Sequence, residues 1–239
     1  MKKIYIILVL VFVIGISTSN IYAQFVVAQD TIRGRIDFCD RPGDLNNGLI
    51  IPNDTVFYLF PPDLEIDPWR NVDLYLPNRD IRQGYIRGTD LMRVDDYDVV
   101  EVERLSSHGS ISFKSNDIRV NIVVANIKSN ELANKQYSDG NNYINGKKAR
   151  GISRWGHPRL KYQSITVSIK GRNIPIPRKV YEHLFEPEID NMIVYHNPLK
   201  DIVYIVTNNG GINTYYNAMW AVSPQGVANA YIYDPSDRK

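Results

Sequence analysis

The chain has 239 residues, a formal net charge of +2 at pH 7 and one cysteine, Cys39. Acidic and basic residues are interspersed, which excludes a nucleic-acid surface, and one cysteine excludes an internal disulfide. The length is ample for one large or two small hydrophobic cores, and we expect Cys39 to behave as a small buried hydrophobe.

The first residues have the layout of a secretory signal peptide. Lys2 and Lys3 precede an apolar run over residues 4–16, and small and polar residues follow as far as Ala23. The run has 13 residues, whereas roughly 20 are needed to span a bilayer, which favours a cleaved signal over a membrane anchor. We expect cleavage after Ala23, which removes both lysines and brings the formal charge from +2 to zero. The mature protein is predicted to be exported to the periplasm, the medium or the cell surface, with no membrane span.

Beyond the signal, alternating β-branched and aromatic residues, interrupted about every ten residues by Asn, Asp, Gly or Pro, predict an all-β protein. The predicted strands are 31–38, 55–60, 72–76, 85–86, 99–104, 110–114, 118–127, 164–170, 173–176, 192–196, 202–208, 218–223 and 228–233. One stretch, 177–185, predicts a helix of about two turns, because Pro177 suits a helix start and Val180, Leu184 and Phe185 fall on one face.

These elements predict a small barrel-like N-terminal module and a C-terminal antiparallel β-sheet domain with one short helix. We place the module at 24–98, linking strands at 99–127, a polar connecting segment at 128–162 and the C-terminal domain at 163–239. The polar segment is long for a featureless loop, so part of it is expected to pack or to cover something, with Trp155 and Tyr162 as the anchors.

The sequence contains no motif with the spacing needed for metal binding, phosphate binding or a nucleophilic serine. The four histidines, His108, His157, His183 and His196, are scattered, and no cysteine cluster exists, so no metal site is predicted. Residues 140–149 superficially match a phosphate-binding loop, but five residues separate the glycines instead of four. There is no G-x-S-x-G elbow. We therefore assign no catalytic residue and no cofactor.

Acidic residues concentrate after the predicted helix, at Glu186, Glu188 and Asp190, and again at Asp95, Asp96 and Asp98. Solvated turns explain both groups, and a calcium or carbohydrate site is the alternative. Paired carboxylates for hydrolysis leave no spacing in a sequence, so that chemistry stays open.

The stretch "TNNGGINTYYNAMW", residues 207–220, has paired Asn and paired Gly before an aromatic run, which favours a hairpin turn with positive backbone angles. Exposed tyrosines beside such a turn can also form a binding face, because tyrosine buries a large area at low entropy cost. The candidate ligand-binding residues are Asn208, Asn209, Tyr215, Tyr216 and Trp155.

Two resemblances add to this interpretation. Trp69 and Val72 in one strand, then Gly84-Tyr85-Ile86 and a closing Leu91, resemble the Src-homology-three-like domains of bacterial exported and cell-wall proteins. That resemblance implies a small barrel in which the tryptophan-headed strand pairs with the Gly-Tyr-Ile strand. Residues 162–191, 194–211 and 215–222 are similar to uncharacterised exported proteins of Bacteroidetes type, which implies an architecture and an exported habitat but no activity.

The leading hypothesis is an exported, non-catalytic binding protein whose partner is a protein or a glycan of the cell envelope. One alternative is an immunity-type protein that neutralises an exported toxin. The other is a hydrolase of cell-wall or polysaccharide substrates that uses the carboxylates of Glu186 and Glu188.

Overall fold

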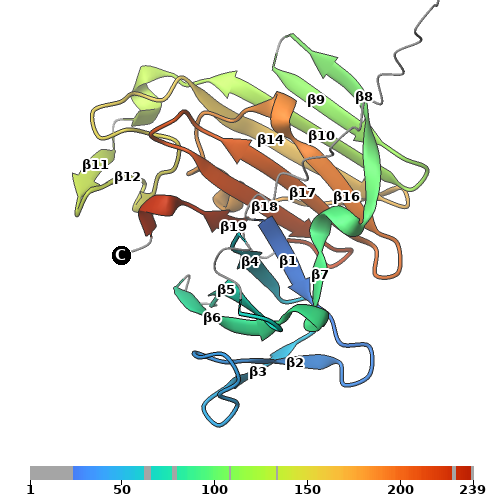
Figure 1. Cartoon of the computed structure of the whole chain (residues 1–239). Helices are drawn as coiled ribbons and strands as arrows, with labels where there is room; N and C mark the ends of the chain where they lie inside the picture. Colours follow the sequence, from blue (N-terminus) through green and yellow to red (C-terminus); the bar gives the residue numbers. More distant parts are fainter. Residues whose placement is uncertain are drawn as a thin grey trace, which may run out of the picture.

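The computed structural model describes residues 24–61, 66–76, 80–107, 109–132, 134–227 and 230–237, and these residues form an all-β protein with no helix of seven residues or more (Figure 1). The all-β prediction is confirmed. The predicted signal peptide, residues 1–23, lies outside the described residues. No helix within them has the length and apolar character needed to cross a bilayer.

A five-stranded antiparallel sheet and a two-stranded hairpin form the N-terminal module. The sheet has the order β6-β5-β4-β1-β7, with strands β1 (Gln24–Ala28), β4 (Val56–Leu59), β5 (Trp69–Tyr75), β6 (Ile81–Arg87) and β7 (Leu91–Arg93), and the hairpin is β2 (Arg35–Phe38) and β3 (Leu49–Pro52). The hairpin packs on the sheet through a core in which Phe38 stacks on Phe57, and an isolated bridge joins Cys39 to Tyr85. Trp69 is 8% exposed and pairs with Arg87 of β6, so this tryptophan is packed.

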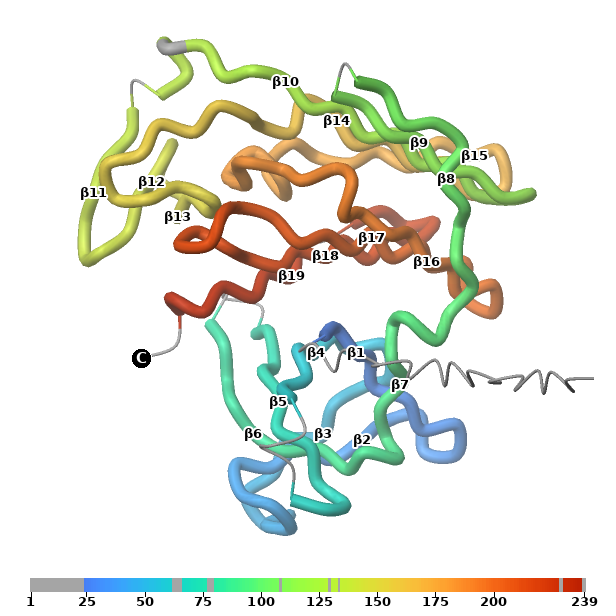
Figure 2. The backbone as a smooth tube through the Cα atoms, turned by 45° about the horizontal axis from the view of Figure 1, so that its top comes forward, coloured from blue at the N-terminus to red at the C-terminus, as the bar shows by residue number. Residues whose placement is uncertain are grey.

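Nine antiparallel strands form the second sheet, in the order β15-β14-β10-β9-β8-β16-β17-β18-β19. They are β8 (Asp98–Ser106), β9 (Ser110–Lys114), β10 (Ile118–Asn126), β14 (Leu160–Ile169), β15 (Arg172–Ile174), β16 (Ile193–Asn197), β17 (Ile202–Asn209), β18 (Tyr216–Val222) and β19 (Ala230–Tyr233). The sheet curls so that β8, β9, β10, β14 and β15 form one layer over β16 to β19 (Figure 2). The stretch 99–127 thus supplies three strands of this sheet.

The curled sheet closes around residues 177–191, whose apolar side chains fill its concave side. Val180, Tyr181 and Leu184 belong to the same buried cluster as Trp220, and Trp220 Nε1 donates a hydrogen bond to the Val180 carbonyl at 3.2 Å. The helix predicted over 177–185 is reduced to one 3-10 turn, Arg178–Val180, so its predicted length was wrong.

The helix does not continue past this turn because its backbone N–H and C=O groups form hydrogen bonds with neighbouring segments of the chain. The Phe185 N–H donates to the Arg150 carbonyl, the Arg150 N–H donates to the His183 carbonyl, and the Glu186 N–H donates to the Leu160 carbonyl. These tertiary bonds replace the i to i−4 bonds that a second helical turn would need.

A third sheet of three strands lies inside the segment expected to be a connection. It comprises β11 (Lys135–Ser138), β12 (Asn141–Ile144) and β13 (Lys147–Lys148), at one end of the molecule beside the turn Pro235–Asp237 (Figure 1). Short 3-10 turns complete the described secondary structure: η2 (Gly88–Asp90), η3 (Val94–Asp96), η4 (Ser129–Leu132), η5 (Arg178–Val180), η6 (Ile189–Asn191) and η7 (Pro235–Asp237).

The N-terminal module and the nine-stranded sheet are joined by a buried aromatic cluster. Phe25 and Tyr58 from the module pack with Tyr204 and Met219 from the large sheet, and all four are at most 3% exposed. Tyr58 also stacks on Tyr233 of β19 with ring centroids 3.9 Å apart. The two halves therefore meet through buried apolar side chains, which favours one cooperative unit.

Candidate functional site

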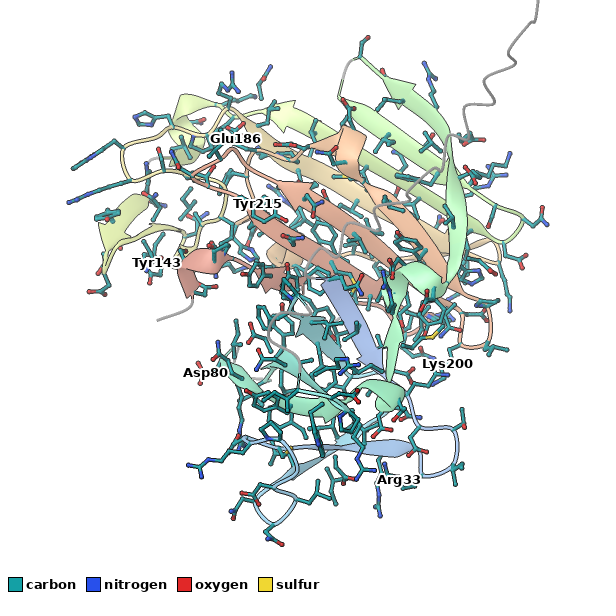
Figure 3. All side chains as sticks on the ribbon, in the orientation of Figure 1. Arg33, Asp80, Tyr143, Glu186, Lys200 and Tyr215 are labelled. Atoms are coloured by element: carbon teal, nitrogen blue, oxygen red, sulfur yellow. The ribbon has the colours of Figure 1, made fainter. Side chains whose placement is uncertain are left out.

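A cleft of about 840 Å³ opens at the end of the molecule where the three-stranded sheet and the β17–β18 turn lie together. Its walls come from residues 140–142, 148–149, 151–154, 210–215 and 234–236. Figure 3 labels Tyr215 at the β17–β18 turn and Tyr143 on the three-stranded sheet. The volume is within the range of about 300–1,000 Å³ that is typical of ligand sites.

The β17–β18 turn forms one wall, and its shape depends on Gly210. This glycine has a φ of +79°, and a Cβ there would lie 2.2 Å from the Thr214 carbonyl oxygen. Thr214 closes the turn, because its N–H donates to the Gly211 carbonyl at 2.9 Å and its hydroxyl accepts from the Gly211 N–H at 3.0 Å. The hairpin turn predicted here is confirmed by the pairing of β17 with β18. At the turn, Ile212 is 99% exposed and Tyr215 is 39% exposed.

The loop 151–156 supplies residues 151–154 to the wall of the cleft and is held by side chains from the small sheet. The buried Asn142 donates from Nδ2 to the carbonyls of Ile152, at 3.2 Å, and Ser153, at 3.0 Å. Lys135 Nζ donates to the Gly156 carbonyl at 2.5 Å. The loop is therefore fixed by hydrogen bonds before any ligand arrives.

An exposed cluster of Tyr137, Arg154 and Trp155, here called the aromatic platform, continues this wall onto the surface. Trp155 is 79% exposed and Tyr137 is 41% exposed. Their rings stack with centroids 6.4 Å apart and planes inclined by 21°. The Arg154 guanidinium carbon lies 4.7 Å from the Tyr137 centroid and 4.6 Å from the Trp155 centroid, within cation–π range. Arg154 also lines the cleft, so platform and cleft are continuous.

The side of the cleft next to the C-terminus contains a compensated group of ions. Arg150 Nη1 lies 2.5 Å from Asp234 Oδ2 and 2.8 Å from Asp237 Oδ1, and Lys148 also pairs with Asp237. Burial by itself would raise the pKa of the Asp237 carboxyl, but the hydrogen bonds from Arg150 and Lys148 outweigh it and lower that pKa below its ordinary value. Two cations and two anions leave this group without net charge.

A second hollow, of about 550 Å³, lies between the N-terminal module and the large sheet and shares Tyr215 with the cleft. Phe25, Tyr195 and Val206 supply apolar wall. Asn217 lines it too, with Nδ2 donating to Asn208 Oδ1 at 2.7 Å.

The structure separates the five predicted ligand-binding residues into two groups. Trp155, Tyr215 and Asn208 are exposed. Asn209 and Tyr216 are 1% and 0% exposed and hold the turn from within. Asn209 Oδ1 accepts from Tyr162 Oη at 3.1 Å, and Tyr216 Oη donates to the Phe185 carbonyl at 2.8 Å.

Two members of the platform, Tyr137 and Arg154, were missed by sequence reasoning. Arg154 adjoins Trp155 in the chain, and this dipeptide was the available signal because guanidinium groups stack on aromatic faces. Tyr137 is 18 residues from Trp155, and only the fold of the small sheet brings it to the indole.

Metal binding, thiol chemistry and carboxylate catalysis were the other chemistries considered from the sequence, and the described residues form no site for them. Within the residues that the structure describes, no group of three or more His, Cys, Asp or Glu side chains could hold a metal ion. Cys39 is 0% exposed and burial raises the pKa of its thiol, so its prediction as a buried hydrophobe is confirmed. Glu186 accepts a hydrogen bond from the Arg159 N–H and so joins two segments of the chain, whereas Glu188 accepts from Asn191 Nδ2 at 2.7 Å within its own loop.

No protein-family model, curated protein or solved structure matches this chain. The two resemblances suggested by the sequence therefore stay predictions. What can be said about function rests on the cleft, the second hollow and the aromatic platform.

Proposed function

We propose that this protein is an exported, non-catalytic binding protein of the bacterial periplasm or cell surface, and that it holds its partner at the cleft and the aromatic platform. Export is supported by the signal-like residues 1–23. Binding is supported by the geometry of the cleft, and the partner belongs to the cell envelope.

The observation that carries the proposal is the concentration of exposed apolar side chains around the cleft. Ile212 and Tyr215 line the cleft and are 99% and 39% exposed, and Trp155, which follows the cleft-lining Arg154 in the chain, is 79% exposed. Contiguous exposed apolar surface on a soluble protein typically marks an interaction site, and aromatic anchors dominate the energy of such sites.

The walls are also preorganised. The loop 151–156 is fixed by Asn142 and Lys135, and the turn at 210–215 is closed by Thr214. A partner that docks there does not have to order these loops, and the entropy cost of binding falls accordingly.

The test is retention of envelope and cell-wall fractions on the immobilised mature chain. We expect the double variant Trp155→Ala, Ile212→Ser to lose about tenfold or more of the retained partner, because both anchors are removed. Leu199→Ala is the matched control, since Leu199 is 93% exposed and lies at the opposite end of β17 from the cleft. Equal retention by the wild type and the double variant, or no retention by the wild type, would reject the proposal.

A further inference from the structure

The shape of the aromatic platform limits which ligands it can take. The Arg154 guanidinium lies against the rings of Tyr137 and Trp155, and the Trp155 indole is nevertheless 79% exposed, so a flat and mostly apolar ring surface stays open to a ligand. A ligand that covers this surface needs an apolar face of its own, bordered by groups that form hydrogen bonds, because Ser153 and Arg154 next to Trp155 are polar and line the adjoining cleft. A sugar ring has this character, with C–H bonds on its faces and hydroxyls at its edge.

The polar side chains of the adjoining cleft also favour a ligand that carries hydroxyl groups. Asn141, Ser153, Asn213 and Ser236 bring amide and hydroxyl groups to its walls. Such groups both donate and accept hydrogen bonds, as sugar hydroxyls require.

The charges of the cleft do not favour a charged ligand. Lys148 and Asp234, which line it, are held in ion pairs with Asp237 and Arg150. The Arg154 guanidinium lies over the two aromatic rings. A nucleotide or a strongly acidic polymer that bound to Lys148 or Arg150 would have to compete with the carboxylates that already hold these cations.

We infer that the platform and the cleft bind a neutral glycan. One sugar ring stacks on Trp155, and the neighbouring sugars of the glycan are held by the amide and hydroxyl groups of the cleft. This inference rests on the proposed function and names its ligand class. The cleft volume of about 840 Å³ accommodates more than one sugar ring. The platform is open to solvent, so an internal stretch of a long glycan can reach it as well as a chain end.

The experiment is affinity electrophoresis of the mature chain in gels that contain β-glucan, xylan or mannan as neutral probes, with polygalacturonate as the acidic probe. We expect at least one neutral polysaccharide to retard the wild type. Trp155→Ala should weaken that binding about tenfold or more, whereas Trp155→Phe should keep a substantial part of it, because a ring remains for stacking. Leu199→Ala should bind as the wild type does, and added salt should have little effect.

Trp155 is 79% exposed, so its variants should keep the unfolding midpoint of the wild type, and this is checked first. No retardation by any neutral probe, or retardation that Trp155→Ala leaves unchanged, would overturn the inference. Retardation by polygalacturonate alone, abolished by salt, would overturn it too. If the envelope partner is lost in the Trp155→Ala, Ile212→Ser variant while no polysaccharide binds, the glycan is wrong and the proposed binding function stands.

Discussion

At the scale of single residues, Gly151 sets the course of the cleft wall. Its φ is +81°, and a Cβ there would lie 2.4 Å from the Phe185 carbonyl oxygen and 3.1 Å from the ring of Tyr216. We expect Gly151→Ala to lower the free energy of unfolding by about 2–4 kcal/mol, since it combines left-handed strain with a clash against backbone. Urea denaturation followed by circular dichroism measures the change.

The variant Gly146→Ala separates the effect of left-handed backbone strain from the effect of the steric clash on the free energy of unfolding. Gly146 has a φ of +73°, and a Cβ there meets nothing within 4 Å. This variant should therefore lose only about 1–2 kcal/mol, from backbone strain alone. Equal losses in the two variants would show that contact with Phe185 is not responsible.

Asn209, one of the predicted ligand-binding residues, is 1% exposed and holds neighbouring groups from within the fold. Its Oδ1 accepts from Tyr162 Oη, from the Glu188 N–H at 3.0 Å and from Thr207 Oγ1 at 3.0 Å, inside the protein. Asn209→Ala should destabilise the fold by about 2–4 kcal/mol, because it leaves buried donors without an acceptor. Asn213→Ala, in the exposed turn, should change the free energy of unfolding by less than about 0.5 kcal/mol. Thermal unfolding of both variants decides, and a stable Asn209→Ala protein would contradict this role.

The pattern Asn-Asn-Gly-Gly predicts the turn correctly, but it cannot say which asparagine faces outward. Asn208 is exposed and Asn209 is buried because successive residues of β17 point to opposite faces of the sheet. The direction of that alternation is decided by the core on the concave side, which is a tertiary property. Trp155 illustrates the same limit, since its exposure follows from the fold of the small sheet.

At the scale of elements, strands with one buried face were predictable. The predicted strand 110–114 coincides with β9, and 118–127 differs from β10 by one residue, because apolar and polar residues alternate there. β1 was missed because four of its five residues are buried and no alternation marks it. β11 and β12 were missed because their sequences are polar and their pairing depends on turns at Asp139-Gly140 and Asn145-Gly146, all of which have positive φ.

The C-terminal turn η7 is attached through the ion pairs of Asp237, so the stability of the protein should depend on pH. In the folded protein the pKa of the Asp237 carboxyl is lowered below the ordinary value of 3.8. The stabilisation is therefore fully present above pH 3.8 and is lost as the pH falls through the lower folded pKa. Asp237→Asn should cost about 1–3 kcal/mol at neutral pH, since charge-assisted bonds from Arg150 and Lys148 are weakened.

The measurement is the free energy of unfolding of the wild type and of Asp237→Asn, from neutral pH to below pH 3.8. The difference between the two should shrink as the acid range is entered. Asp190→Asn, at an exposed position of η6, is the matched control and should follow the wild type throughout. A difference that is constant with pH would mean that Asp237 acts through packing instead of charge.

At the scale of the whole molecule, the aromatic cluster between the two sheets determines whether they unfold together. Tyr97 stacks on Tyr204 and Tyr75 meets the edge of Tyr231, both with ring centroids 5.4 Å apart, in addition to the contact of Tyr58 with Tyr233. Lys200, labelled in Figure 3, also joins the halves through an ion pair with Asp54, but both side chains are at least one third exposed, so the pair contributes little. Burial of the rings is the main link, and it predicts a single transition.

Two single-tryptophan proteins test this prediction. Trp69 lies in the N-terminal module and Trp220 in the large sheet, so each reports on one half when the other two tryptophans are replaced by Phe. In each of the two proteins we expect tryptophan fluorescence and far-UV circular dichroism to give coincident urea transitions. Met219→Ala, at a residue with 0% exposure in the joining cluster, should shift both transitions by the same amount, about 2–5 kcal/mol, because the cavity opens between the halves. Leu199→Ala should shift neither. Two separate midpoints, or a shift of the Trp220 signal alone, would show that the sheets fold as independent domains and that the cluster is only a contact between them.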